Sequence, residues 1–528
     1  MNPPSQANTD TGKDTGSSSL TLMLIALGTV VTVALLHLLD RHSELIEAKK
    51  DEYYYVVYVG CGLVLSRLIT ARWQIVAIVT AVLWACIAWL FYVSDVTSEI
   101  PGAFPVWMDI NASDYLAIGY GIVKLFASFL AIVCFNRLLG ALGVDMRMAA
   151  MVCAMLVIWF ILDYLTGGIF FKARNLYNLA VQSSTVGVMA TGMVLVIVAR
   201  HIDLSVGSVL GFTGMVIATL QAPSPLGFGM DWQYTMLIGL AVGGLVGLWQ
   251  GWWVAYRGVP AFVVTLAGLM MFRGAAYITA DGRTMAPMNE TYQLLGGGID
   301  GSIGAKWSWI LGIVAVAMVL WTTVLGRMRK LRYGFKPKPV WAEIILFVLS
   351  VSLIIGFVLV MNSYYKPRTE ISRGIPIPVL ILIGVVVIMT LIAKVTKFGR
   401  YVFAIGGNPE AAELGGINVK FVTMFIFVIM GLLAGVGGVI TTARLNSGLN
   451  SLGMLQELNV IAAAVIGGTS LAGGIGTITG AILGAVIMQS LENGIVLMGY
   501  SSSMRQVVIG AVLIFAVWFD VVYNKQKK

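Results

Sequence analysis

The sequence predicts an all-α fold, a polytopic transmembrane helical bundle of 12–16 membrane segments with some of them discontinuous. Composition is the first reason: 58% of the 528 residues are hydrophobic and 11% are charged, against roughly 25% charged residues in an ordinary soluble domain. The second reason is that apolar runs approaching the ~20 residues needed to cross a bilayer recur along the chain. A water-soluble globule, a disordered chain and a nucleic-acid binder are thereby excluded.

The predicted membrane segments follow one another with short polar connections. They occupy residues 20–39, 53–70, 74–93, 115–134, 148–165, 177–199, 203–220, 235–255, 260–278, 307–325, 341–361, 374–393, 421–440, 460–475, 476–493 and 504–521. Segments 203–220 and 460–475 are short or interrupted by glycine, which indicates re-entrant or discontinuous helices. Their comparable positions in two parts of the chain favour an inverted-repeat core.

Composition divides the chain into four parts. Residues 1–19 form a polar tail, and residues 20–147 form a transmembrane extension to which the sequence assigns no function. Residues 148–521 form a core that contains the motifs described below. Residues 522–528 are a basic tail.

Basic residues in short loops predict the orientation of the segments. Loops 326–338 and 394–420 are rich in lysine and arginine, so both are expected in the cytoplasm, and segment 94–114, which carries acids and no basic residue, is expected outside. Alternation then places both termini in the cytoplasm. Loop 362–373 does not fit, because its three basic residues are placed outside.

The 60 glycines favour helices that approach closely in lipid through small residues. Two pairs spaced four residues apart, Gly243 with Gly247 and Gly431 with Gly435, predict such helix contacts.

One polar motif follows the apolar run that ends near Arg200. Asp203, Ser205 and Ser208 enter the next apolar segment there. An Asp ahead of a helix can accept hydrogen bonds from its first free N–H groups, so a purely structural N-cap is one interpretation. The other is that these polar groups line a hydrophilic path, because ionisable residues at membrane depth are costly and often functional.

A second motif, in loop 394–420, predicts a helix of little more than one turn. Asn408 can cap it, Pro409 suits its first position and Glu410 its first turn, whereas Gly415 and Gly416 end it. A short helix with small residues at its exposed end would fit a cleft in a partner, and an ordinary surface loop is the alternative.

Five segments together resemble the permease subunits of bacterial ATP-binding-cassette importers for monosaccharides, in the ribose/xylose branch. The segments are residues 201–208, 260–274, 374–378, 406–412 and 465–474. The extra helices between the basic loop 326–338 and loop 394–420 most resemble the xylose-type permeases. The resemblance covers about residues 148–521, and it departs at His201, where the usual pattern has Gly or another residue.

The resemblance implies roles for particular residues. The short helix would be the coupling helix, with contacts to the ATPase from Asn408, Glu410, Ala411, Ala412, Gly415 and Gly416. The translocation path would run beside Asp203, Ser205, Ser208, Thr469 and Ser470. On the outer side, a sugar-binding protein could contact Asn446, Ser447 and Asn450, although a solvated connector explains that loop equally well.

The resemblance also implies the function and the partners. The chain would be a permease of the bacterial inner membrane that works as a homodimer and imports a neutral monosaccharide, xylose or a related pentose or hexose. It would bind no cofactor or metal and hold no catalytic residue, because ATP and Mg²⁺ belong to a separate ATP-hydrolysing subunit. The sequence indeed lacks a phosphate-binding G-x-x-x-x-G-K-[ST] loop, an H-E-x-x-H zinc motif and a G-x-S-x-G elbow. An extracytoplasmic sugar-binding protein, membrane lipid and no nucleic acid complete the expected partners.

Two alternatives remain open at this point. In an ion- or proton-coupled secondary sugar transporter, Asp203 or Asp163 would titrate. An intramembrane enzyme or lipid flippase would need a polar cluster, and none stands out in the sequence.

Overall fold

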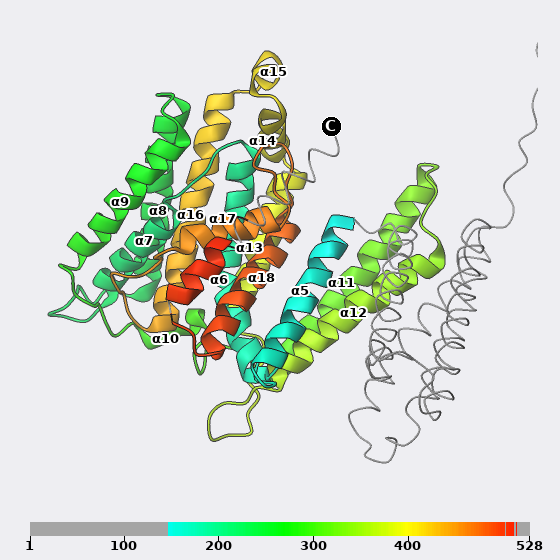
Figure 1. Cartoon of the computed structure of the whole chain (residues 1–528), viewed down its shortest axis with the longest axis horizontal. Helices are drawn as coiled ribbons and strands as arrows, with labels where there is room; N and C mark the ends of the chain where they lie inside the picture. The colour runs from blue at the N-terminus through cyan, green and yellow to red at the C-terminus, as the bar shows by residue number, and fades with distance from the viewer. Residues whose placement is uncertain (1–145, 502, 512–513, 515–528) are drawn as a thin grey trace, which may run out of the picture. The chain divides into compact units, whose positions relative to one another are not determined.

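The structure is a computed structural model that describes residues 146–501, 503–511 and 514. Across this part of the chain every regular element is a helix, which confirms the predicted fold class (Figure 1). The tails 1–19 and 522–528 lie outside the described residues, and so does the extension 20–147 apart from its last two residues.

The helices are given in chain order with their bounds. They are α5 (Met146–Leu165), α6 (Ala173–Val198), α7 (Val206–Gln221), α8 (Trp232–Ala255), α9 (Ala261–Thr279), α10 (Glu290–Gln293), the 3-10 turn η3 (Leu294–Gly296), α11 (Gly304–Arg332), α12 (Val340–Asn362), α13 (Ile377–Lys394), α14 (Lys397–Gly407), α15 (Pro409–Leu414), α16 (Val419–Leu445), α17 (Gln456–Ile466) and α18 (Ile478–Leu497).

Nine helices in the described residues are long and apolar enough to cross a membrane. The two segments expected to be short, 203–220 and 460–475, overlap α7 and α17, which are apolar helices of 16 and 11 residues. Segment 460–475 shares only residues 460–466 with α17, and the rest of it is non-helical. The total of 12–16 for the whole chain stays a prediction, because four of the expected segments precede residue 146.

Two groups of helices repeat one arrangement in opposite directions. The first group is α6 to α9, and the second is α16, α17, α18 and the helical residues 503–511. α6 runs toward α14 and α15, whereas α16 starts beside α15 and runs away from it (Figure 1). Each short helix packs against the long helix of the other group, α7 on α16 and α17 on α6. Two groups of helices that run in opposite directions, each with its short helix packed on the long helix of the other group, have the arrangement of an inverted repeat.

Glycine determines how closely α8 packs on α16. A Cβ on Gly243 would collide with the carbonyl of Gly431, and a Cβ on Gly431 with the carbonyl of Gly243. Gly247 likewise faces the carbonyl of Phe427, and Gly435 faces Leu240 of α8. Both predicted glycine pairs therefore lie in this one contact, where they let two backbones touch.

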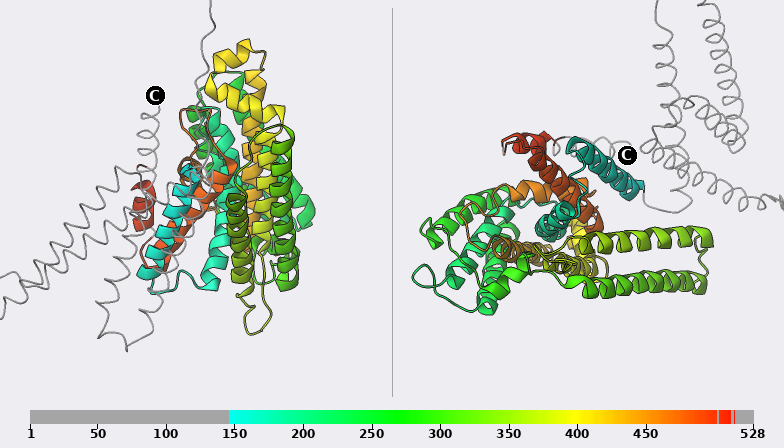
Figure 2. Two further views of the ribbon diagram at one scale, coloured as in Figure 1. Left: turned by 90° about the vertical axis from the view of Figure 1, so that its right-hand side faces the viewer. Right: turned by 90° about the horizontal axis from the view of Figure 1, so that it is seen from below.

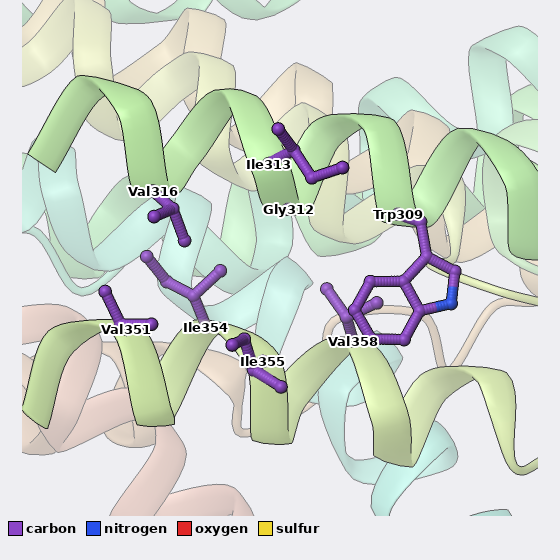
Figure 3. Close-up of a pocket in the computed structure, with 8 residues that line it drawn as sticks. All are labelled: Trp309, Gly312, Ile313, Val316, Val351, Ile354, Ile355 and Val358. Carbon is purple, nitrogen blue, oxygen red and sulfur yellow. The ribbon is translucent and has the colours of Figure 1, made fainter. Parts of the chain in front are cut away.

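Helices α11 and α12 form a hairpin whose side chains are largely exposed (Figure 2). Arg327 donates to Glu343 at 2.7 Å and to the Lys338 carbonyl at 3.1 Å, which fixes the turn between the helices. Between them lies a cavity of about 190 Å³ (Figure 3). Its lining is hydrocarbon apart from the Trp309 indole, with Gly312 facing Val358. An apolar space of this kind offers a polar substrate almost no hydrogen bonds.

The structure explains the basic loop that did not fit the predicted orientation. In the connection between α12 and α13, Lys366 pairs with Asp300 at 2.6 Å. The guanidinium of Arg373 is buried between two rings, 5.3 Å from the centroid of Tyr177 and 4.5 Å from that of Tyr364. Two of the three basic residues thus have structural partners, and the loop is a poor indicator of topology.

Loop 394–420 contains more structure than the sequence analysis expected. Before the predicted short helix lies α14, an amphipathic helix. The Thr396 hydroxyl accepts a hydrogen bond from Gly399 N at 3.1 Å at its start, and Val402 and Ile405 are buried. This segment was predicted from the sequence as part of a long loop, and α14 was not predicted.

The contact between α8 and α16 yields a prediction about stability. Gly431→Val should destabilise the fold by about 1–3 kcal/mol or more, because a side chain there must push two backbones apart. The control is Gly326→Val on α11, where an added Cβ meets no atom within 4 Å. Thermal melting of the purified protein in detergent checks this: equal melting temperatures for the two variants would contradict the close-packing role.

Candidate functional site

Three of the quoted motifs meet at the end of α6 that lies beside α14 and α15. The connector 199–205 follows α6, residues 406–408 comprise the end of α14 and the one residue between α14 and α15, and the Gly-rich connector 467–477 joins α17 to α18. Gly474 N donates to the Val198 carbonyl at 2.9 Å, so the 467–477 connector is bonded directly to the end of α6. We call this region the coupling junction.

The side chain of Arg200 joins the connector after α6 to the end of α14 within the coupling junction. Its Nε donates to the Gly406 carbonyl at 2.8 Å and its Nη2 to the Gly407 carbonyl at 2.6 Å, just before α15 begins. Its backbone has a φ of 65°, in the left-handed region. A non-glycine residue there costs roughly 1–2 kcal/mol, so the side-chain bonds offset a strained backbone. No role for Arg200 was predicted from the sequence.

Glycine is required where the three segments touch. A Cβ on Gly406 would collide with the Val198 carbonyl, and a Cβ on Gly473 would collide with the Arg200 side chain. Gly473 also has a φ of 88°. The glycines of the motifs thus permit direct backbone contact between α6, α14 and the 467–477 connector.

Asp203 forms a tight turn and does not cap α7. Its Oδ1 accepts from Ser205 N at 2.8 Å and from the Ser205 hydroxyl at 2.6 Å. The N-cap residue of α7 is Ser205, and no side chain caps the helix. The structural N-cap interpretation of Asp203 is therefore wrong: the carboxylate bonds within the connector, ahead of the first helical N–H groups.

Side chains of α8 and α9 form hydrogen bonds to the connector that contains this turn. Gln250 Nε2 donates to the Ser205 hydroxyl at 2.7 Å, and the Thr265 hydroxyl donates to the Ile202 carbonyl at 3.2 Å. Gly268 leaves the space that the Gln250 amide occupies. Gln250 was missed by the sequence analysis, although a lone amide in an apolar segment is a recognisable signal.

His201, where the sequence departs from the usual pattern, is held without a charged partner among the residues that the structure describes. Its ring lies 6.0 Å from the ring of Phe427, centroid to centroid. Burial lowers the pKa of the imidazole, so the side chain is neutral at neutral pH.

All five residues expected beside the translocation path are buried. Ser208 and Thr469 have hydroxyls with no hydrogen-bond partner among the described residues. The Ser470 hydroxyl accepts from Ala472 N at 3.3 Å. Asp203 and Ser205 bond to each other, as described above. The structure thus places these residues at the coupling junction and in the first turn of α7, and their role in a path stays a prediction.

The predicted short helix is present as α15. The Asn408 side chain accepts from Ala411 N at 3.1 Å, Pro409 occupies the first turn, and Gly416 follows the helix with a φ of 83°. Glu410, like Asn408, Ala411, Gly415 and Gly416, is exposed.

Two residues of α15 change the expected contact surface. Ala412 is buried and belongs to the main hydrophobic core, so it anchors the helix from inside. Leu414 is 91% exposed at the opposite side of the helix. A single exposed leucine is common on a protein surface, so it is the position of Leu414 on the predicted coupling helix that makes it a candidate contact. This residue was not predicted from the sequence.

The three residues expected to meet a binding protein also bond within the chain. Asn446 Oδ1 accepts from Met288 N at 2.7 Å, and Asn450 Nδ2 donates to the Gly282 carbonyl at 2.8 Å. The Ser447 hydroxyl donates to the Leu445 carbonyl at 3.1 Å. The two amides connect the 446–455 connector to the loop after α9, and the binding-protein contact stays a prediction.

A polar cavity of about 360 Å³ lies away from the coupling junction. Its lining consists of Gln182, Thr185, Val186, Leu210, Thr441, Arg444, Gly453, Gln456, Gln489, Glu492, Asn493, Val496 and Arg505. None of the five residues expected beside the path is among them.

Comparisons with known proteins agree with the motifs. Residues 175–517 match the family described as "Branched-chain amino acid transport system / permease component". The chain is 38% identical over 381 residues to the "Xylose transport system permease protein XylH" of Escherichia coli K12, covering 72% of this chain and 93% of that protein. It is 32% identical over 351 residues to the "Ribose import permease protein RbsC" of the same organism, covering 66% and 87%. No solved structure matches the chain.

The geometry of the coupling junction yields a prediction about local dynamics. Arg200→Ala should increase amide hydrogen exchange in residues 406–416 severalfold, because two carbonyls lose their donor. Arg200→Gly should do the same although it relieves the left-handed strain, since the side chain is again absent.

The matched control for this prediction is Arg400→Ala. Arg400 donates to the Val395 carbonyl at 3.0 Å, at the other end of α14. Exchange in residues 406–416 that responds equally to both arginine substitutions would show that Arg200 has no special function at the junction.

Proposed function

Because the chain belongs to the branched-chain amino acid transport permease family, as a permease of the ATP-driven sugar importer type, we propose that it imports a neutral monosaccharide, with xylose as the first substrate to test. The proposal places the chain in the bacterial inner membrane with both termini in the cytoplasm. It works as a homodimer with two ATP-hydrolysing subunits, which hold the ATP and Mg²⁺, and receives sugar from an extracytoplasmic binding protein.

The observation that carries the proposal is the coupling junction. An importer of this class needs a surface element that the ATPase subunit can bind. That element must also be rigidly connected to the membrane helices. α15 offers the surface, with Leu414 exposed and Ala412 held in the core. Arg200, just after α6, bonds to the end of α14 directly before α15, so a displacement of α15 would be transmitted to the end of α6.

The choice of xylose rests on the relatives. The xylose permease is matched over 93% of its length and the ribose permease over 87%. At 38% identity the substrate can change within a family. The proposal therefore commits to the class of substrate, a small neutral sugar, which the names of both relatives share.

Reconstituted transport tests the function directly. The full chain, its ATPase and its binding protein in proteoliposomes should take up D-xylose in an ATP-dependent manner, and loaded binding protein should stimulate ATP hydrolysis. Uptake that follows an ion gradient with no ATPase present would support the secondary-transporter alternative. ATP-dependent movement of lipid, with no sugar taken up, would support the flippase alternative.

The coupling helix yields a separate prediction about assembly. Leu414→Ala should weaken binding of the ATPase subunit about tenfold or more, as expected for an exposed apolar anchor that becomes buried in a complex. Because Leu414 contacts little in the chain, the melting temperature of the isolated permease should not change. The double variant Glu410→Lys with Gly415→Trp should uncouple ATP hydrolysis from uptake.

The matched control is Leu331→Ala, which removes another exposed leucine, near the end of α11. Co-purification of the ATPase and the ratio of ATP hydrolysed to sugar taken up provide the measurements. If the α15 variants assemble and transport like the control, α15 is not the coupling helix.

A further inference from the structure

We propose that the polar cavity between the two repeats is an entry site that binds the neutral monosaccharide before it crosses the membrane. This inference rests on the proposed function and goes beyond it, because it places the substrate among named residues within one protomer. None of the predicted path residues belongs to this site.

The cavity has the size and the walls of a small-molecule site. Its volume of about 360 Å³ falls within the range of about 300–1,000 Å³ typical of ligand pockets. The first repeat contributes Gln182 and Thr185 from α6, and the second contributes Thr441 from α16 and Gln489 from α18. A relative movement of the repeats would therefore change the shape of the site.

Two amide oxygens in the cavity lack a partner. Asn493 Oδ1 and Gln456 Oε1 are buried atoms with no hydrogen bond among the described residues. The Asn493 side chain is 8% exposed and lies in the lining. A buried acceptor without a donor is unfavourable, and a ligand that brings hydroxyl donors would satisfy both.

The charged groups of the lining, Arg444, Arg505 and Glu492, disfavour a cationic ligand. Glu492 is already bonded: its carboxylate lies 3.4 Å from Arg505 and accepts from Gln489 at 2.6 Å and from Asn459 at 3.3 Å. No acid therefore remains to hold a cationic ligand. Arg444 adds a planar donor group to the lining, and such a fork can donate to adjacent hydroxyls of a sugar.

The cavity lies toward the ends of the helices that are far from α15. Gln182 is in the first half of α6, which runs toward α15, and Arg444 is near the end of α16, which runs away from it. With α15 in the cytoplasm, as proposed, this is the outer half of the protein. A sugar released by a binding protein would reach this site first.

The test is direct binding of D-xylose to the full chain assembled with its ATPase in nanodiscs, observed by saturation-transfer difference NMR. Wild type should bind the sugar without any binding protein. Asn493→Leu combined with Gln456→Leu should bind about tenfold more weakly or worse, because two acceptors for hydroxyl groups are lost. Uptake at saturating loaded binding protein should fall by a similar factor.

Two further variants keep the test decisive. Gln233→Leu removes an exposed amide of α8 that does not line the cavity, and should leave binding unchanged. Val496→Trp, at a position 57% exposed, should block the cavity and reduce binding while every polar group remains. Assembly with the ATPase, measured by size-exclusion chromatography, shows which variants are folded.

The outcomes separate this inference from the proposed function. If wild type takes up no sugar at all, the proposed function fails. If wild type takes up xylose, but the folded double variant and Val496→Trp bind and transport it like Gln233→Leu, only the entry site is wrong. Stronger binding of the xylonate anion than of xylose would overturn the assignment to a neutral ligand.

Discussion

Helical structure is interrupted after α6 and after α17, and the backbone groups at these two interruptions must form hydrogen bonds within the protein. The rest of the structure depends on how they do so. Lipid offers no donors or acceptors, so irregular backbone at membrane depth is tolerated only where protein satisfies it. Here the connector after α17 satisfies the end of α6, since Gly474 N bonds to the Val198 carbonyl. Arg200 satisfies the carbonyls at the end of α14. One set of bonds thus stabilises both interruptions and positions α15.

The inverted repeat follows from the same constraint. A short helix such as α7 cannot bury itself alone, and it packs on α16 of the other repeat while α17 packs on α6. This exchange leaves Asp203, Ser205 and the glycines of the 467–477 connector at one end of the bundle. At the other end the repeats enclose the polar cavity. The two ends therefore differ chemically: backbone bonds close one, and unpaired amides lie in the other.

Local signals in the sequence were sufficient for part of this structure. The Asn408 and Pro409 pair predicted α15 because capping depends on adjacent residues alone, and the spacing of Gly431 and Gly435 predicted a close helix contact. The bonds of Arg200 could not be predicted, since they join residues more than 200 positions apart. The N-cap interpretation of Asp203, one of two left open, was wrong because its carboxylate could bond to Ser205 as readily as to α7, and only the fold decides between them.

The polar cavity was beyond sequence reasoning for a similar physical reason, and its place in the fold bears on how the proposed transport would work. Its lining comes from both repeats, so no single segment contains the pattern. The coupling junction also joins both repeats, through Val198 of the first and Gly474 of the second. A ligand can shift a conformational equilibrium only by binding the states differently. A displacement of α15 acts on both repeats at one end of the bundle. The affinity for a sugar bound between the repeats at the other end would depend on their separation. Movement of α15 and binding of sugar could therefore influence one another without direct contact.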